Sequence, residues 1–193
     1  IASGDALVVL AHQERAARYH LDRVGTRASA SDQGHRLTGV KSLVPAGDEA
    51  DAFIVPANAG GGDDDDSGIA LFLVERVASG VTVRGYPTQD GARAAELTLT
   101  AAPATLISTD GLDELEAGVD TAIAAVCAEA VGAMDKLVAV TIEYMNTRKQ
   151  FGATLASFQA LRHRIADVKM QLELGRSMSY FASLKLGEPA PQR

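Results

Sequence analysis

The chain has 193 residues, 47% of them hydrophobic, and carries 18 Lys and Arg against 25 Asp and Glu, which is the profile of a globular protein with one core or two. The formal net charge of -7 and the lack of a basic block exclude the phosphate-neutralising surface of a nucleic-acid-binding protein. No apolar run reaches the roughly 18 residues of a membrane span and the N-terminus has no signal-peptide pattern, so a cytoplasmic protein is expected.

The first 107 residues have the pattern of a β-domain. Seven segments are short, β-branched or alternating, and each is bounded by Gly, Pro, Asp or Asn. Strands are predicted at residues 5–11, 24–30, 36–44, 52–56, 69–76, 81–86 and 95–100. The sequence therefore predicts a barrel or sandwich of antiparallel strands over residues 1–107.

A run of four carboxylates, Asp63 to Asp66, follows three glycines between two of these strands. Calcium loops space their carboxylates at alternate positions around a turn-forming glycine. Because this run is contiguous, a solvated flexible loop is expected and no metal site is predicted. The sequence also lacks HExxH, paired CxxC, GxSxG and Walker motifs, so it gives no support to a metalloprotease, zinc-ribbon, serine-hydrolase or P-loop protein.

Residues 108–193 have the pattern of two long helices. The apolar stripe of the first helix, about 35 residues long, is predicted to be Leu112, Leu115, Val119, Ala122, Val126, Ala130, Ala133, Leu137, Val140 and Tyr144. Cys127 in this helix is expected to be a small buried hydrophobe. The second helix is predicted to begin at Ser157 as N-cap. Two such helices cannot cover their apolar faces against each other alone, so they are predicted to be the first two helices of an antiparallel four-helix bundle.

Both ends of the sequence suggest a fragment. The chain opens at Ile1 rather than Met, and it stops soon after the second helical pattern. We therefore expect it to be truncated at both ends.

The bend between the helices carries the most specific pattern in the sequence. It reads TRKQFG at residues 147–152, followed by FQALRHRIAD at residues 158–167. This pair resembles the flavin-contacting helix-turn-helix of the acyl-CoA dehydrogenase family. Three stretches are similar to the family's middle domain: LTGVKSLVPAGDEADAFIV (37–55), GIALFLVER (68–76) and AAELTLTAAPA (94–104). The resemblance implies an α+β fold, with an antiparallel middle β-barrel followed by a C-terminal four-helix bundle.

The resemblance also implies a function. Family members use FAD, held between barrel and bundle and shared across a dimer interface, to introduce an α,β double bond into an acyl-CoA thioester. The implied setting is fatty acid or lipid metabolism, with electron-transferring flavoprotein as the electron acceptor. The implied assembly is a homodimer or tetramer, or a heteromer.

Five residues at the bend match cofactor-contacting positions of the family. Arg148, Gln150 and Phe151 match residues that meet the adenosine and pyrophosphate part of FAD, usually the FAD of the partner subunit. Phe158 and Gln159 match the next contact pair. The resemblance thus implies that this short segment binds cofactor.

Physical chemistry leaves two interpretations of the bend open. A guanidinium such as that of Arg148 can pair with pyrophosphate oxygens in a bidentate way, and Gly152 allows the chain to reverse with a positive φ. In the alternative, Arg148 and Lys149 complement the C-terminus of the first helix and Gly152 caps it.

Two turns in the β-domain depart from the family pattern. His12 to Arg15 stand where the family has Thr-Glu-Pro-Gly over the flavin ring, and Glu14 is the clear identity. Leu43 and Pro45 stand where an aromatic ring and a hydroxyl flank the flavin. Backbone N–H groups of the same turns remain available for the ligand.

The catalytic base implied by the family is a Glu that removes the α-proton. In most members it lies beyond the point where this chain ends, and in others it would fall at Ala122, with Ile123 in place of a substrate-contacting Arg. Glu129 is the carboxylate in the apolar middle of the first helix, which makes it the candidate catalytic residue of this chain. A helix-stabilising or helix–helix hydrogen-bonding role is the alternative for Glu129.

Three functional hypotheses follow. The first is an FAD-dependent acyl-CoA dehydrogenase. The second is a non-catalytic subunit that shares FAD in a heteromeric member, which the altered turns favour. The third is a helical interaction domain without a ligand.

Overall fold

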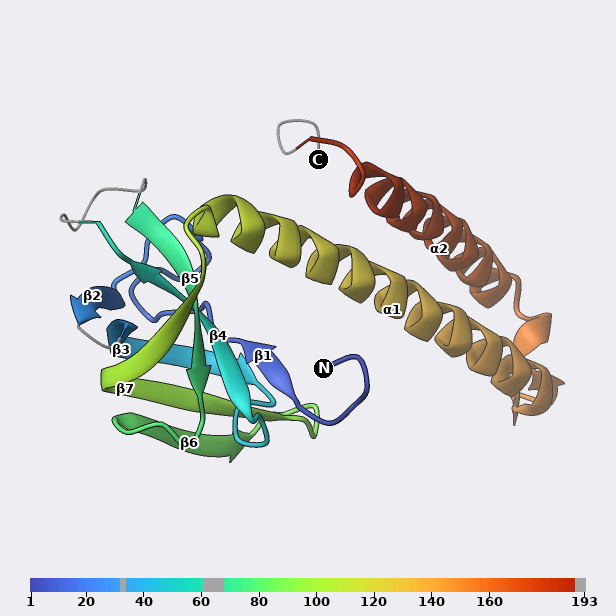
Figure 1. The fold of residues 1–193 in the computed structure, drawn as a ribbon. Helices are drawn as coiled ribbons and strands as arrows, with labels where there is room; N and C mark the ends of the chain where they lie inside the picture. Colours follow the sequence, from blue (N-terminus) through green and yellow to red (C-terminus); the bar gives the residue numbers. More distant parts are fainter. Residues whose placement is uncertain (32–33, 61–67, 190–193) are drawn as a thin grey trace. The chain divides into compact units, whose positions relative to one another are not determined.

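The computed structural model describes residues 1–31, 34–60 and 68–189 (Figure 1). The chain divides into two compact units, residues 1–116 and 117–193, and each is described by itself. The boundary predicted after residue 107 stays a prediction. The acidic run from Asp63 to Asp66 lies outside the described residues.

The first unit is a seven-stranded sheet that closes on itself. Its strands are β1 (Val8–Leu10), β2 (Arg27–Ser31), β3 (Gly34–Pro45), β4 (Ala52–Asn58), β5 (Ile69–Glu75), β6 (Val81–Pro87) and β7 (Arg93–Ser108). Pairing runs β4-β2-β3-β7-β5, and β5 also pairs with β4, which closes a barrel; β1 pairs with β4, and β6 with β7. The predicted barrel is confirmed. It is not purely antiparallel, because β1 and β2 each pair with β4 in parallel.

Alternate residues of the strands fill the barrel. Phe53 and Val55 of β4, Phe72 and Val74 of β5, and Leu97 of β7 are fully buried. Side chains on a strand alternate between its two faces, so these residues share the inner face. The period-two pattern of the sequence therefore marks the core correctly.

Strand β7 is longer than predicted, because it continues from Thr100 to Ser108. The prediction stopped where Ala-Ala-Pro breaks the alternation of apolar residues. The later part of β7 pairs with both β3 and β5, so tertiary pairing extends a segment that has weak strand propensity of its own.

The helical elements are α1 (Gly111–Thr147), the short 3₁₀ helix η2 (Leu155–Ser157) and α2 (Gln159–Lys185). Both long helices are confirmed, but the predicted N-cap is wrong. The hydroxyl of Ser157 donates to the carbonyl of Thr154 at 2.7 Å inside the 3₁₀ turn. Phe158, with an extended backbone, precedes α2 instead.

Within the second unit, α1 packs on α2 through a face other than the predicted stripe. The buried residues of α1 there recur every seven positions, as in a helix–helix seam: Ala124, Val131, Val138 and Met145. Val126, Leu137, Val140 and Tyr144 of the predicted stripe are exposed, and so is Cys127, so its predicted burial is wrong in this chain. Both faces are apolar, and the sequence period alone does not tell which of them meets α2.

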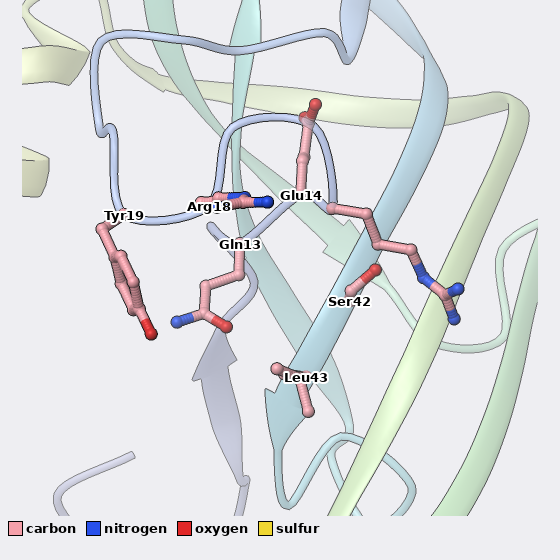
Figure 2. A pocket seen from close by; sticks show the side chains of 7 residues that line it. Gln13, Glu14, Arg18, Tyr19, Ser42 and Leu43 are labelled. Atoms are coloured by element: carbon pink, nitrogen blue, oxygen red, sulfur yellow. The ribbon is translucent and has the colours of Figure 1, made fainter.

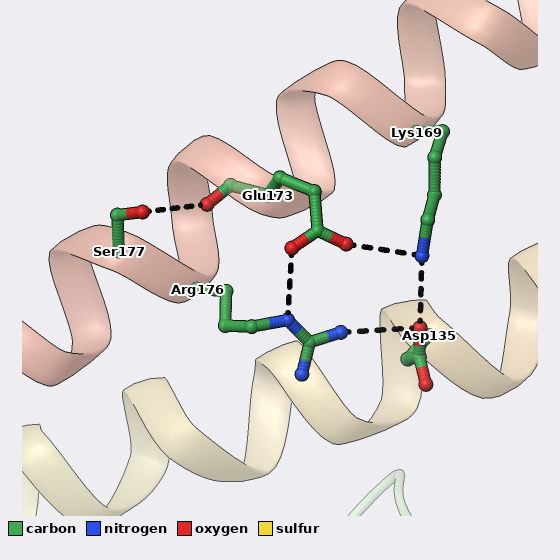
Figure 3. Close-up of polar contacts among 5 residues, drawn as sticks. All are labelled: Asp135, Lys169, Glu173, Arg176 and Ser177. Atoms are coloured by element: carbon green, nitrogen blue, oxygen red, sulfur yellow. Dashed lines mark hydrogen bonds and ion pairs between the residues drawn. The ribbon is translucent and has the colours of Figure 1, made fainter.

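A cluster of charges joins the two helices beside this seam (Figure 3). Asp135 of α1 accepts from Lys169 at 3.5 Å and from Arg176 at 3.2 Å. Glu173 of α2 pairs with the same two cations, at 3.0 Å and 3.2 Å. These side chains are solvent-exposed, so the pairs contribute little to stability, and their shared geometry matters mainly for the register of the helices.

Within the described ranges, neither long helix has a stretch apolar enough to cross a membrane.

Candidate functional site

The barrel unit has an open pocket of about 330 Å³ between two turns. Five of the seven side chains that line it come from the segment between β1 and β2, and two come from β3 (Figure 2). They are Gln13, Glu14, Arg15, Arg18, Tyr19, Ser42 and Leu43. Gln13, Glu14, Arg15, Ser42 and Leu43 belong to the two turns that the sequence matched to flavin-flanking segments, whereas Arg18 and Tyr19 lie beyond the first of them.

A bulge in β3 forms one wall of this pocket. The register of β3 against β7 shifts between Lys41 and Val44. Leu43 in this bulge has a φ of +52° and its side chain is 56% exposed. A bulge breaks the alternation of a strand and redirects side chains, and a left-handed backbone at a non-glycine residue is a strained conformation of the kind that clusters at functional sites. The sequence of β3 therefore interrupts its own ladder where the pocket lies.

A backbone bond joins the two walls. The amide of Ser42 donates to the carbonyl of Gln13 at 2.8 Å. This hydrogen bond fixes the distance between the bulge and the opposite turn.

An ion pair lies next to this bond. Glu14 accepts hydrogen bonds from the Lys41 ammonium at 2.6 Å, the Thr26 hydroxyl at 2.7 Å, the Thr26 amide at 3.0 Å and the Gly25 amide at 2.8 Å. The Lys41 side chain is fully buried and that of Glu14 is 10% exposed. One carboxylate therefore ties together the pocket turn, the segment before β2, and β3.

The pKa values of these groups follow from burial and from the pair. Burial by itself raises the pKa of the Glu14 carboxyl, but the Lys41 charge and the hydrogen bonds from Lys41, Thr26 and Gly25 bring it below its ordinary value. Burial lowers the pKa of the Lys41 ammonium, and Glu14 opposes that change. Burial, and then Lys41, also lower the pKa of His12.

Two polar atoms beside the pocket are buried without a partner among the described residues. They are the hydroxyl oxygen of Ser42 and Nδ1 of His12. Buried polar groups are nearly always hydrogen-bonded, so such atoms next to a pocket are suited to a ligand. The pocket is lined by apolar surface and a few polar groups, which is the usual composition of a small-molecule site.

The helical unit brings the five predicted cofactor residues together at its bend. Between α1 and η2, the short strands β8 (Lys149–Gln150) and β9 (Ala153–Thr154) pair as a hairpin that the sequence did not predict. Its two-residue loop is Phe151–Gly152, with φ of +54° and +78°. Two successive positive φ values are the signature of a type I′ hairpin turn, so the predicted positive φ at Gly152 is confirmed.

The bend presents its side chains outward. Phe151 is 95% exposed, and its ring meets that of Phe158 edge to face, with centroids 6.4 Å apart. Arg148, Gln150 and Gln159 are exposed, and Arg148 makes no ion pair with any described residue. An exposed guanidinium, amides and an aromatic edge on one rigid turn are suited to a phosphate and a flat heterocycle. The five assignments stay predictions.

Glu129, the candidate catalytic residue, lies on α1 in the second unit, where it is exposed. The described residues contain no cluster of three or more His, Cys, Asp or Glu that could hold a metal ion.

The pocket residues were only partly accessible to sequence reasoning. Glu14 and Leu43 lie in the matched turns, as Ser42 does, but Lys41 does not. A signal for Lys41 existed, because it shares the inward register of β3 with Leu37 and Gly39. A lysine on the inner face of a barrel strand requires a buried partner.

A small closed barrel with a pocket between two turns, followed by paired long helices with an exposed bend, defines a class of α+β proteins. Residues 10–101 match the family model of the acyl-CoA dehydrogenase middle domain, and residues 109–193 match that of its C-terminal domain. The chain belongs to the acyl-CoA dehydrogenase family.

Individual relatives agree with this assignment. Acyl-CoA dehydrogenase FadE27 of Mycobacterium tuberculosis is 33% identical over 142 residues, which cover 73% of this chain and 36% of that protein. The crystal structure of an FAD-dependent dehydrogenase matches with a TM-score of 0.88 and 28% identity, over 98% of this chain and 53% of that one. Butyryl-CoA dehydrogenase from Megasphaera elsdenii matches with a TM-score of 0.86 and 27% identity, over 94% and 50%. The chain thus spans about half the length of these solved structures and about a third of FadE27.

Proposed function

We propose that the whole protein is an FAD-dependent acyl-CoA dehydrogenase that introduces an α,β double bond into an acyl-CoA thioester. The observation that carries this proposal is the pocket between the turns at Gln13–Tyr19 and Ser42–Leu43, in a chain whose two units both belong to the family. Solved relatives described as an FAD-dependent dehydrogenase and a butyryl-CoA dehydrogenase support both cofactor and substrate class.

The pocket residues suit a flavin ring. The apolar side chain of Leu43 would lie against the ring, and the buried Ser42 hydroxyl, which has no partner among the described residues, would meet a polar ring edge. FAD, when bound, supplies the acceptor for the hydride that leaves the β-carbon. The residues of the two turns bind and orient the ring and exclude water from one side of it.

The bend suits the other end of the cofactor. We assign Arg148, Gln150, Phe151, Phe158 and Gln159 to the adenosine and pyrophosphate of FAD, in a partner subunit where the assembly is a dimer. Arg148 would pair with phosphate oxygens, and the Phe151 and Phe158 rings would pack beside the nucleoside.

The remaining parts of the proposal rest on family membership. The substrate class is acyl-CoA, the electron acceptor is electron-transferring flavoprotein, and the assembly is a homodimer or tetramer. Cytoplasmic location stays a prediction. Glu129 stays the candidate base within this chain, although its exposed position agrees equally well with a base located elsewhere in the whole protein.

A second candidate is a non-catalytic subunit of a heteromeric member. The observations that favour it are Leu43 and Pro45 in place of the expected aromatic ring and hydroxyl, and Ala122 and Ile123 where some members have the base and an Arg. Such a subunit would contribute the bend to a shared FAD without carrying out proton removal.

Flavin retention by the full-length protein tests the cofactor assignment. Arg148→Ala should lower the flavin-to-protein ratio after gel filtration, with roughly tenfold weaker FAD binding, because one charge-assisted phosphate contact is lost. Lys149→Ala is the matched control, since Lys149 is an exposed cation on the same hairpin and was not assigned to the cofactor. Equal flavin retention by wild type and Arg148→Ala would show that the bend does not contact FAD.

A further inference from the structure

The two walls of the pocket are joined by polar contacts that involve lining residues and the adjacent Lys41. Glu14 belongs to the first wall, and Lys41 immediately precedes Ser42 of the second. Their 2.6 Å contact lies beside the Ser42-to-Gln13 backbone bond of 2.8 Å. These two polar contacts between the turns therefore involve residues of the ion pair or residues next to it.

We propose that Glu14 and Lys41 are positioning residues, whose ion pair sets the spacing of the two turns and so the fit of the planar ring held between them. The ring in this statement rests on the proposed function. The spacing itself does not, because it is a property of the protein alone.

The hydrogen-bond count of Glu14 supports a positioning role. The carboxylate accepts four hydrogen bonds, three of them at its Oε1 atom, from two other segments of chain, Gly25–Thr26 and Lys41. A carboxylate satisfied in this way has one allowed position, since moving it breaks several bonds at once. The turn that carries Gln13 and Tyr19 is therefore fixed relative to β3.

The surrounding backbone is fitted to the pair. A Cβ added at Gly25 would lie 2.9 Å from a Glu14 oxygen, and one added at Gly39 would lie 2.4 Å from the Thr26 hydroxyl. Gly25 lets the chain approach the Glu14 carboxylate, and Gly39 lets it approach Thr26, which donates to that carboxylate. A larger residue at either position would push Thr26 or the carboxylate out of place.

Stability alone does not explain the pair. Burying two charges costs several kcal/mol of hydration, and an apolar pair of similar volume is often at least as stable. The neighbouring inward residues Leu37 and Val44 are apolar and fully buried. An ion pair at this one point of the core is better explained by the geometry that it imposes than by the free energy that it contributes.

The test uses the full-length protein with Glu14→Gln, Lys41→Met and the double variant. Two measurements are made on each: hydrogen exchange at the Ser42 amide and over residues 12–19, and the reduction potential and absorption bands of bound flavin. Asp48→Asn is the matched control, because Asp48 is a carboxylate of the same barrel that pairs with Arg93, is 12% exposed and does not line the pocket.

Each single variant should exchange the Ser42 amide at least roughly tenfold faster than wild type, since one charge is left buried without its partner. Each should also shift the flavin potential and absorption bands. The double variant should recover thermal stability but not the flavin properties. That result would distinguish an effect on the position of the turns from an effect on the stability of the fold. Asp48→Asn should leave both measurements as in wild type.

The outcomes are distinguishable. The proposal is overturned if Glu14→Gln and the double variant both exchange the Ser42 amide at the wild-type rate and both keep the wild-type flavin properties. This holds whatever the stability of the variants. If the wild-type protein holds no flavin, the proposed function fails. Exchange at Ser42 then decides the positioning role alone: unchanged exchange overturns it and faster exchange supports it.

Discussion

The Glu14 carboxylate makes a pH-dependent contribution to the stability of the barrel. Its pKa in the folded protein is below the ordinary value of 4.5, because Lys41 and several hydrogen bonds outweigh the opposite effect of burial. A carboxyl whose folded pKa is depressed contributes stability that is present above the unfolded pKa. That contribution is lost as pH falls through the folded pKa.

We therefore predict a pH-dependent difference between wild type and Glu14→Gln. Wild type should have the higher free energy of unfolding above about pH 4.5, and the difference should shrink as the pH falls below that value. Urea denaturation followed by circular dichroism at several pH values between neutrality and strong acid would measure it. If the difference in the free energy of unfolding stays constant with pH, the ionised Glu14 carboxylate is not stabilised by its pair with Lys41.

At the scale of single residues, the sequence predicts a property that follows from the residue type. It does not predict a property that depends on contacts with distant residues. The positive φ at Gly152 follows from residue type, and the structure has it. The unusual backbone of Leu43 does not, because a bulge arises from how β3 pairs with a distant strand. The same holds for Lys41, whose burial is explained only once Glu14 lies beside it.

Among the elements, the hairpin at the bend offers a direct test of backbone conformation. Apart from the adjoining backbone, no atom of the described residues lies within 4 Å of a Cβ added at either Gly152 or Gly132. Only their backbones differ, because Gly152 has a φ of +78° and Gly132 lies inside α1. Space around the residue therefore cannot account for a difference between alanine variants at these positions.

Gly152→Ala should lower the free energy of unfolding by about 1 kcal/mol, since an L-residue is strained at positive φ. Gly132→Ala should raise it by about 0.5 to 1 kcal/mol, since alanine is the better helix former. Thermal and urea denaturation of the two variants measure the pair of effects. Two changes of the same sign would mean that the turn at Phe151–Gly152 is not formed as described.

The elements themselves were more predictable than their contacts. All seven predicted strands exist and the helix α1 begins within a residue of its predicted start, because period and turn residues are local signals. The sequence does not tell which face of α1 meets α2, since the helix is apolar on more than one side. The strands β8 and β9 have two residues each, which is too short for any periodic pattern.

At the scale of the whole molecule, the helical unit exposes many apolar side chains on both long helices. On α1 they include Val126, Leu137 and Val140, and on α2 they include Leu174 and Phe181. Apolar surface of this extent marks an interface in a folded protein. It agrees with the family fold, in which further helices complete a bundle, and with a chain that spans about half of its solved relatives.

Anaerobic titration of the full-length protein with acyl-CoA thioesters, followed by visible absorption, tests the account most directly. We predict a protein that is isolated with flavin and whose oxidised flavin band is bleached on addition of a thioester of suitable chain length. A flavin-containing protein that no acyl-CoA bleaches, across short, long and branched chains, would contradict the enzyme and leave the non-catalytic subunit in its place.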